Sequence, residues 1–362
     1  MPRRILSSRL LDVDAQRICL IKPSALGDVI QTLPLLPILR ERFPHAEISW
    51  VVGDRLTDLL DGHPHLDRVI RFEQRRAFGG WIRLLRELRQ REFDLVFDLQ
   101  GLLRTAVMTA ATRAPLRIGL ETAREGSHLV CHGLLHDSGR LVPAHIRYWR
   151  VAEAIGMGGF RRETIVPIRQ DDRNRMQELL RGLSGPMLAI HPGARWVTKR
   201  WPVEKFAAVA AKAKRSFCFS FLILGSRSEM PVATHLERLL RRFVPSAGLV
   251  NLAGQTTLRQ LAAALQFADV LLTNDSGPMH LAAGLGTPVV GIFTCTDPQR
   301  SGPPGDSHEL ISTQVSCAGS YHRRCPHRGR RHMACLEELD IERVWRGLVR
   351  LVKKLHHEEA AA

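Results

Sequence analysis

The sequence predicts an α/β protein with two doubly wound domains. Short apolar runs of strand length alternate with amphipathic stretches of helical period over most of the chain, as is typical of parallel βαβ units. The chain has 362 residues, which is more than one domain of ordinary size. Glycine and proline clusters at 156–159 and 182–186 mark a boundary between two halves.

Four segments define the order of elements in the first half. Arg17–Lys22 is an apolar run of strand length, and Asp28–Phe43 has the period of an amphipathic helix. Glu47–Val52 and Asp94–Asp98 are the next two predicted strands. Because helical stretches connect these strands, we expect them to pair in parallel.

The second half repeats this pattern. Phe217–Leu224 is almost entirely apolar and is therefore expected to be a strand that is covered on both faces. The other predicted strands are Pro186–Ile190, Ala268–Thr273 and Thr287–Phe293, and the predicted helices are Val203–Arg215, Arg259–Phe267 and Ile341–His357.

These elements divide the chain into an N-terminal domain (residues 1–165), a linker (166–185) and a C-terminal domain (186–340). The final helical segment, 341–362, carries apolar residues at helical spacing, and it is open whether it packs on its own half or back on the N-terminal domain. In open parallel sheets, ligands bind outside the carboxyl ends of the strands. With two such halves, the expected site is a central cleft that both domains face.

Composition narrows the choice of partners and compartment. The 52 Lys and Arg residues outnumber the 36 Asp and Glu residues, and the formal charge of +16 favours nucleotides, phosphorylated glycolipids, acidic membrane or nucleic acid. Nucleic acid is disfavoured because aromatic residues are only 6% and no nucleic-acid-binding signature is present. No apolar run is long enough to span a bilayer, the first nine residues do not form a secretory signal, and seven cysteines are too few for a disulfide framework. The expected compartment is the cytoplasm.

The first candidate site follows the first predicted strand, in Lys22–Val29 (KPSALGDV). Asp28 would lie at the ligand edge of the sheet, where a carboxylate can remove a proton from a substrate hydroxyl. The alternative is a loop in which Gly27 adopts a special backbone angle and Asp28 caps a helix. The segment is neither a Walker loop nor a GxGxxG turn, so it does not predict a dinucleotide by itself.

The second candidate site is Thr273–Ala283 (TNDSGPMHLAA), which follows a strand and opens a helix, with Pro278 suited to the first turn. Unpaired backbone N–H groups at such a helix start, helped by the helix dipole, bind phosphate. Gly277 lets a phosphate approach the backbone, and Ser276 and His280 can donate hydrogen bonds to it. The alternative is ordinary helix capping.

The third candidate site is a loop formed by His191–Arg195 (HPGAR) and Thr198–Pro202 (TKRWP). It carries three cations, Arg195, Lys199 and Arg200. Cations at this edge would stabilise a departing diphosphate, whose charge grows as its bond breaks. In a neighbouring edge loop, Glu229 can accept a hydrogen bond from a ribose or sugar hydroxyl. A solvated basic loop is the alternative interpretation.

A basic segment near the C-terminus, residues 321–332, holds five arginines and three histidines without an acidic residue. Cys317, Cys325 and Cys335 surround it and, with one of its histidines (His322, His327 or His332), would make a Cys₃His zinc site. No C-x₂-C pair is present, so we expect no metal site and favour a basic surface loop that can contact anionic headgroups.

A second basic segment lies in the first half. Arg75 and Arg76 are followed by Trp81–Arg86 (WIRLLR), which predicts a loop and then a basic amphipathic helix. This helix either presents a solvated face above the core or contacts a membrane or an acceptor molecule.

Together with further motifs, these segments make the chain resemble glycosyltransferase family 9, the ADP-heptose:lipopolysaccharide heptosyltransferases. The resemblance covers nearly the whole length, and the order and spacing of the motifs are specific although each motif is weak alone. The motifs are Lys22–Val29, Asp98–Arg104 (DLQGLLR), Thr122–Glu125 (TARE), Lys199–Pro202 (KRWP), Asn274–His280 (NDSGPMH) and Thr296–Pro298 (TDP). The second and third of these are most similar to the heptosyltransferase I type.

The resemblance implies a GT-B fold of two Rossmann-like domains, with the acceptor on the N-terminal one and the donor on the C-terminal one. It implies an inverting transfer of heptose from ADP-heptose to the Kdo/heptose inner core of lipopolysaccharide, without a covalent sugar–enzyme intermediate. By position, Asp28 is the general base, and Lys199 contacts the donor phosphates and stabilises departing ADP. The other implied donor-binding residues are Arg200, Glu229, Asp275, Ser276, Gly277 and His280. The implied acceptor-binding residues are Ser24, Gly27, Arg104 and Arg124.

The implied acceptor is polyanionic and sits in the cytoplasmic leaflet of the inner membrane, so we expect peripheral association with that membrane. ADP-heptose is a substrate, and no cofactor or essential metal is expected because cations and a helix start can stabilise the leaving group. Three alternatives stay open: transfer of another nucleotide sugar to a cell-surface glycan, a GT-B sugar-nucleotide epimerase or hydrolase, and a non-enzymatic anion-binding protein.

Overall fold

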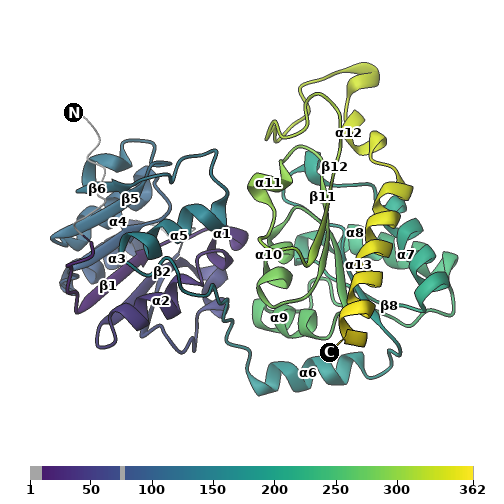
Figure 1. Ribbon diagram of the computed structural model, residues 1–362, viewed down its shortest axis with the longest axis horizontal. Helices are drawn as coiled ribbons and strands as arrows, with labels where there is room; N and C mark the ends of the chain where they lie inside the picture. The colour runs from purple at the N-terminus through teal and green to yellow at the C-terminus, as the bar shows by residue number, and fades with distance from the viewer. Residues whose placement is uncertain (1–9, 74–77, 362) are drawn as a thin grey trace. The chain divides into compact units, whose positions relative to one another are not determined.

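The computed structural model describes residues 10–73 and 78–361. The chain divides into two compact units, unit 1 up to Pro167 and unit 2 from Ile168 (Figure 1). The division lies just beyond residue 165, at the start of the segment that was expected to be a linker. Arg75 and Arg76 of the predicted basic loop lie outside the described residues.

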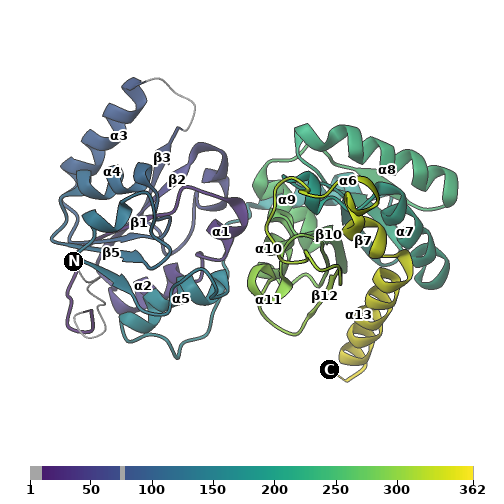
Figure 2. The ribbon, with the colours of Figure 1, turned by 90° about the horizontal axis from the view of Figure 1, so that it is seen from above.

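Unit 1 contains a six-stranded parallel sheet in the order β3-β2-β1-β4-β5-β6. Helices α3 and α4 cover one face of the sheet, and α2 and α5 lie on the other (Figure 2). The strands are β1 Arg17–Ile21, β2 Glu47–Gly53, β3 Arg68–Phe72, β4 Leu95–Asp98, β5 Leu116–Leu120 and β6 Gly133–Leu135. The helices are α1 Leu26–Ile30, α2 Leu35–Arg42, α3 Phe78–Gln90, α4 Leu103–Thr112 and α5 Ala144–Ala154, with 3₁₀ turns η1 Asp54–Leu59 and η2 Ser127–Val130.

Unit 2 contains a second six-stranded parallel sheet, in the order β12-β11-β10-β7-β8-β9. Its strands are β7 Met187–His191, β8 Ser220–Ile223, β9 Leu249–Asn251, β10 Val270–Asn274, β11 Val289–Phe293 and β12 His308–Ser312. Its helices are α6 Gln170–Leu180, α7 Val203–Phe217, α8 Met230–Phe243, α9 Leu258–Gln266, α10 Gly277–Gly284, α11 Pro298–Ser301, α12 Ala334–Glu338 and α13 Ile341–Ala361. The 3₁₀ turns are η3 Val197–Lys199, η4 Arg227–Glu229 and η5 Gly329–Arg331.

The central strands are buried because helices cover both faces of each parallel sheet. Strands β4, β8, β10 and β11 are buried at every position. The sequence correctly predicted these strands and β1, β2 and β7 as strands, and the parallel βαβ organisation of both halves is confirmed.

The predicted helix Asp28–Phe43 is in fact two helices, α1 and α2, separated by a turn. Pro34 is the N-cap of α2, and because proline has no backbone N–H it cannot continue a helix from the preceding turn. The predicted strand Phe217–Leu224 begins at Ser220 instead. Phe217 ends α7, and Cys218 caps that helix in the left-handed region at φ +58°.

The segment expected as a linker contains α6, which packs on α9 within unit 2, and Asp172 on α6 lies 3.4 Å from the Arg259 guanidinium. The last helix, α13, packs on β11, β12 and α7. Val344, Leu348 and Leu351 belong to the core of unit 2. These contacts favour the alternative in which this helix packs on its own half of the chain.

Candidate functional site

The carboxylate of Asp28 lies in α1, directly after the carboxyl end of β1. The Tyr148 hydroxyl on α5 donates a hydrogen bond to Asp28 Oδ1 at 2.7 Å, and the Ala25 backbone N–H donates to Oδ2 at 3.2 Å. The second contact makes Asp28 part of the cap of α1, as the alternative interpretation of this loop expected. These two contacts orient the Asp28 carboxylate in the loop that follows β1.

Two buried residues near Asp28, Lys22 and Tyr148, shape its surroundings. The Lys22 ammonium donates to the Leu99 carbonyl at 3.0 Å and lies 4.8 Å from the centre of the Tyr148 ring. Burial lowers the pKa of Lys22, although the nearby Asp28 charge opposes this shift. Burial and the Asp28 charge raise the pKa of Tyr148 well above its ordinary value, so Tyr148 stays protonated and acts as the hydrogen-bond donor.

Arg104, on α4, contacts the same loop. Its Nη2 donates to the Ser24 hydroxyl at 3.0 Å. The buried Asp98 holds the start of α4 in place by accepting from the Gly101 N–H at 2.9 Å and from the Thr105 hydroxyl at 2.9 Å. Burial raises the pKa of Asp98, and these hydrogen bonds partly offset the shift. The structure therefore brings Ser24, Asp28 and Arg104 together at the carboxyl edge of the sheet in unit 1.

Arg124 approaches this group through its backbone. Its N–H donates to the Gly101 carbonyl at 3.0 Å. Gly101 has a φ of +65°, and a Cβ there would lie 2.9 Å from the Cα of Ala123, so only glycine fits this close approach. The Arg124 side chain is exposed, 3.9 Å from Glu125. Gly27 lies in the first turn of α1, one residue before Asp28.

In unit 2, Lys199 and Asp275 form a mostly buried ion pair. Lys199 Nζ lies 2.6 Å from Asp275 Oδ2, with side-chain exposures of 16% and 6%. The Thr296 hydroxyl donates to the same carboxylate oxygen at 2.6 Å. The ammonium also lies 4.7 Å from the centre of the Trp196 ring. Asp275 therefore positions the Lys199 ammonium at the carboxyl edge of the sheet.

His191, at the end of β7, connects two further predicted residues. Its Nδ1 lies 3.2 Å from the Ser276 hydroxyl, and its Nε2 lies 3.4 Å from Glu229 Oε2. The same Glu229 oxygen accepts from the Ser226 N–H at 2.8 Å and the Ser226 hydroxyl at 2.7 Å. Burial raises the pKa of Glu229, but the contacts with His191 and Ser226 outweigh burial and lower it to about 2. Glu229 is thus a carboxylate at neutral pH.

Helix α10 begins next to this group. Ser276 is its N-cap but makes no side-chain capping hydrogen bond, because its hydroxyl faces His191 and the hydroxyl of Thr273. The ordinary capping interpretation of Ser276 is therefore wrong. Gly277 opens the helix, followed by Pro278, and the first N–H groups of a helix have no intrahelical partner. His280, one turn further, is buried.

The structure does not bring Arg200 into this group through any contact within the described residues. Its Nε donates to the Ala194 carbonyl at 2.7 Å, and the residue is exposed. Gly193 is packed against Glu229, since a Cβ at this position would lie 2.1 Å from Glu229 Oε1. A larger residue at position 193 would therefore displace the Glu229 carboxylate.

Sequence reasoning assigned no role to Tyr148, His191 or Thr296. Tyr148 lies 120 positions from Asp28 in the sequence. The only feature that could have drawn attention to it is that tyrosine is rare in this chain, which has two. His191 and Thr296 stand inside segments that the sequence analysis quoted. Their position at the ends of apolar strands was the available signal, because strand ends in parallel sheets carry ligand contacts.

The cysteines of the alternative zinc site are not gathered into a metal-binding group in the described residues. Within residues 10–73 and 78–361, no three His, Cys, Asp or Glu side chains are arranged to hold a metal ion. Cys317, Cys325 and Cys335 are free thiols. Burial, with smaller contributions from neighbouring cysteines, raises the pKa of Cys335 to about 11. Without a bound metal, Cys335 is therefore a protonated thiol at neutral pH, which is not the nucleophilic form of cysteine.

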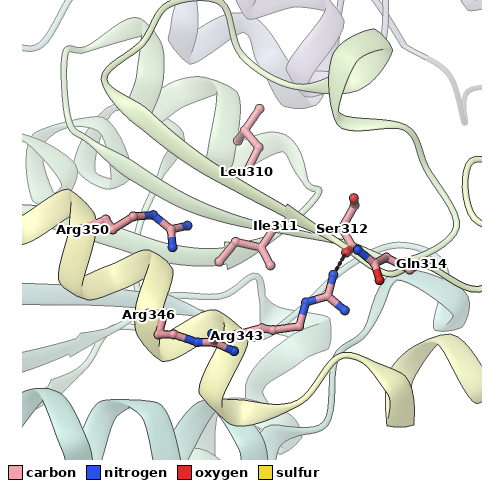
Figure 3. A pocket seen from close by; sticks show the side chains of 7 residues that line it. All are labelled: Leu310, Ile311, Ser312, Gln314, Arg343, Arg346 and Arg350. Carbon is pink, nitrogen blue, oxygen red and sulfur yellow. Dashed lines mark hydrogen bonds between the residues drawn. The ribbon is translucent and has the colours of Figure 1, made fainter.

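A pocket in unit 2 lies between β12 and α13 (Figure 3). Its lining residues are Leu310, Ile311, Ser312, Gln314, Arg343, Arg346 and Arg350. Arg343 is occupied by Glu338 and by the Ser312 carbonyl, and Arg350 by Glu309. None of the predicted site residues lines this pocket, and we assign it no part in the reaction.

No helix in the described part of the chain combines the length and apolar character needed to cross a membrane.

Comparison with known proteins identifies relatives over most of the chain. The model of glycosyltransferase family 9 (heptosyltransferase) matches residues 81–330. A lipopolysaccharide core heptosyltransferase, OpsX, of Haemophilus influenzae is 28% identical over 304 residues, which cover 82% of this chain and 84% of that protein. Lipopolysaccharide heptosyltransferase 1 of Pseudomonas aeruginosa is 29% identical over 336 residues, which cover 85% and 87%. The solved structure of an E. coli ADP-heptose lipopolysaccharide heptosyltransferase II superposes with a TM-score of 0.74 at 21% identity, over 94% of this chain and 99% of that one.

Proposed function

The chain belongs to glycosyltransferase family 9 and has the GT-B fold of two Rossmann-like domains, and on this basis we propose that it transfers heptose from ADP-heptose to the inner core of lipopolysaccharide. The observation that carries the proposal is the family match over residues 81–330. The names of the relatives support both the donor and the class of acceptor.

On the acceptor side, Asp28 is the general base. It removes the proton as the acceptor hydroxyl attacks the anomeric carbon of heptose, and the transfer inverts that carbon without a covalent sugar–enzyme intermediate. The hydrogen bonds from Tyr148 and the Ala25 N–H support this role, because they orient the carboxylate before substrate binds. Arg104, with Ser24, holds acidic groups of the Kdo/heptose acceptor, and the exposed Arg124 adds a second cation.

Gly27 belongs to the same acceptor loop. It lies in the turn that presents Asp28, and its carbonyl accepts from the Gln31 N–H at 3.0 Å and from Gln31 Nε2 at 3.2 Å. We assign Gly27 a backbone contact with the acceptor, since it has no side chain with which to bind it.

On the donor side, Lys199 binds the diphosphate and stabilises the charge that develops on departing ADP. Its ion pair with Asp275, which also accepts from the Thr296 hydroxyl, supports this role, because it fixes the position of the ammonium at the end of a flexible side chain. The start of α10, at Ser276 and Gly277, provides backbone N–H groups for the same phosphates.

Three further residues complete the proposed donor site. Oε1 of Glu229 takes none of the hydrogen bonds found in the described residues, and it is available to a ribose hydroxyl. Arg200 supplies long-range positive charge from an exposed position. His280 supports the phosphate end from the first turn of α10. With these cations and N–H groups in place, the proposed reaction does not depend on a metal ion or a cofactor.

The proposed acceptor is a lipid A–core molecule, so the reaction takes place at the cytoplasmic face of the inner membrane, with the enzyme bound peripherally. The formal charge of +16 supports this location, because the inner core and the lipid surface are both anionic.

The test is to incubate the protein with ADP-heptose, and separately with other nucleotide sugars, in the presence of truncated core acceptors, and to read the products by mass spectrometry. We expect the acceptor to gain one heptose only with ADP-heptose. Transfer from another nucleotide sugar alone would replace the donor in the proposal. Conversion of ADP-heptose without an acceptor would instead identify an epimerase or hydrolase.

A further inference from the structure

The surface formed by α3, α4 and η2 in unit 1 combines features that the reaction does not use. The two helices lie side by side on the same face of the sheet, since Leu84 and Leu88 of α3 and Met108 of α4 share one core cluster (Figure 2). The turn η2 packs against α4. Outward-facing residues of all three elements therefore lie on one side of unit 1.

Large apolar side chains on this surface are exposed. Leu103 is 58% exposed and Leu129 is 79% exposed, and Val107 and Ile82 are also exposed. Leu103 and Val107 are four positions apart and project from the same side of α4. Exposed apolar residues that gather on neighbouring elements mark contacts with partners or membranes.

Three arginines accompany these apolar residues. Arg83, Arg86 and Arg89 are exposed on α3 at a spacing of three, which places them on its outward face. Within the part of the chain that the structure describes, none of the three forms an ion pair with a carboxylate. The nearby Glu87 is instead occupied by Arg91, at 3.1 Å.

The unpaired arginines of α3 differ from the arginines of α13, which is also rich in basic residues. On α13, Arg343 and Arg350 are neutralised by Glu338 and Glu309. The sequence of α4 contains no acidic residue at all (LRTAVMTAAT). The α3–α4–η2 surface thus keeps its positive charge and its apolar side chains available together, which is the pattern of a protein face that lies in a membrane interface.

We propose that the α3–α4–η2 surface docks unit 1 onto an anionic phospholipid bilayer. Leu103, Val107 and Leu129 enter the interfacial region, and the three arginines pair with lipid phosphates. The chain position supports this assignment, because Leu103 directly precedes Arg104 and therefore places the lipid surface beside the proposed acceptor site. In this respect the inference rests on the proposed function, since a lipid-linked acceptor must be reached at the membrane.

The experiment measures binding of the full chain to vesicles by sedimentation. Vesicles of phosphatidylcholine with 30% phosphatidylglycerol are compared with vesicles of pure phosphatidylcholine, both without lipopolysaccharide. The test variant is Arg83→Gln/Arg86→Gln/Arg89→Gln. The matched control, Arg215→Gln/Arg238→Gln/Arg242→Gln, removes the same charge from exposed positions on α7 and α8 of unit 2.

We expect the unaltered chain to bind only the anionic vesicles. Each arginine near such a surface is worth about fivefold in affinity, so the test variant loses about 100-fold while the control loses far less. An equal loss in both variants would mean that net charge alone drives binding, and unchanged binding by the test variant would exclude α3. Absence of binding by the unaltered chain would also overturn the proposal.

A second variant, Leu103→Ser/Leu129→Ser, tests the apolar contribution at unchanged charge. It is expected to bind anionic vesicles at least tenfold more weakly, and circular dichroism checks that it is folded. Binding equal to that of the unaltered chain would overturn the insertion of these side chains.

Vesicle binding and transfer are separable readouts. The triple α3 variant should transfer sugar to a water-soluble truncated acceptor at the unaltered rate, and transfer to an acceptor embedded in anionic vesicles should fall. A chain that binds vesicles without transferring heptose would contradict the proposed function and leave the docking surface intact. If the triple variant transferred heptose to the soluble acceptor and to the embedded acceptor at the rates of the unaltered chain, the docking surface alone would be contradicted.

Discussion

Replacing Lys199 by methionine removes the ammonium that we assign to the donor diphosphate and keeps most of the side-chain volume. Asp275 then loses its partner at 2.6 Å in a position where its own side chain is only 6% exposed. Removing one member of a buried pair typically costs 3–5 kcal/mol because the other charge stays buried. Since Lys199 is 16% exposed and water can reach the site, we expect a loss of about 3 kcal/mol in the free energy of unfolding.

Two further variants separate the effect of the Lys199–Asp275 ion pair on stability from the effect of Lys199 on ADP binding. Asp275→Asn still accepts from the Thr296 hydroxyl and leaves Lys199 partly solvated, so its loss should be smaller, about 1–2 kcal/mol. The double variant, Lys199→Met/Asp275→Asn, should lose less than the sum of the single variants by about 1–3 kcal/mol, because both single variants break the same contact. Urea unfolding of the four proteins measures this coupling.

Binding of ADP behaves differently from stability. A charge-assisted hydrogen bond to phosphate is worth about 1.5–3 kcal/mol, so Lys199→Met should bind ADP about 10- to 150-fold more weakly. The double variant should not regain this affinity, although it regains stability. Isothermal titration with ADP reads the effect. Wild-type affinity in Lys199→Met, or a coupling energy near zero, would refute the assignment of Lys199.

Three further predictions concern neighbouring residues. Tyr148→Phe removes the hydroxyl that donates to Asp28 Oδ1 at 2.7 Å. We expect kcat to fall about tenfold or more while the affinity for ADP stays unchanged. An unchanged kcat would show that other contacts orient Asp28. Gly193→Ala places a Cβ against Glu229 and should cost about 1–3 kcal/mol in unfolding free energy, whereas Gly182→Ala, which has open space around its Cβ position, serves as the control and should be neutral. Burial, followed by the charge of His65, lowers the pKa of His63 from 6.5 to about 4. The neutral ring is thus favoured in the fold, and its stabilisation is complete above pH 6.5 and is lost as the pH falls towards 4. Between pH 7 and pH 5 the loss in unfolding free energy amounts to about 2 kcal/mol. His63→Asn, whose side chain can still accept from the His65 backbone N–H, should lose less stability over the same range. An identical pH dependence of unfolding in both proteins would contradict the shift in the pKa of His63.

The sequence predicted the interior of both sheets better than their edges. Seven of the twelve strands in the described residues were recognised from apolar runs, and all seven are interior strands. The missed strands are β5 and the four edge strands β3, β6, β9 and β12. Edge strands such as β9 are only partly buried, so their residues carry no strong apolar signal.

The site residues show a similar division. Residues that follow apolar strands, such as Asp28 and Asp275, were identified as candidates because strand ends and loops can be read along the chain. Tyr148 was not, since its hydrogen bond to Asp28 joins positions 120 residues apart. The pairing of Lys199 with Asp275 was also not anticipated, because both were expected to face a ligand rather than each other.

The end of the predicted helix Asp28–Phe43 was misjudged for a local reason. Its periodicity is helical throughout, but Pro34 cannot donate the hydrogen bond that a continuous helix needs. Two short helices preserve the apolar period on both sides of the turn, and for this reason periodicity alone did not reveal the interruption.

The most direct test of the account is the transfer rate of Asp28→Asn together with its affinity for ADP. Asparagine keeps the size of the side chain and an acceptor for the Tyr148 hydroxyl but cannot remove a proton. The account predicts that kcat falls by about 10²–10⁴-fold while the dissociation constant for ADP stays within about twofold, since Asp28 belongs to unit 1 and the proposed ADP site to unit 2. Turnover close to that of the unaltered enzyme would contradict the assignment of Asp28 as the general base.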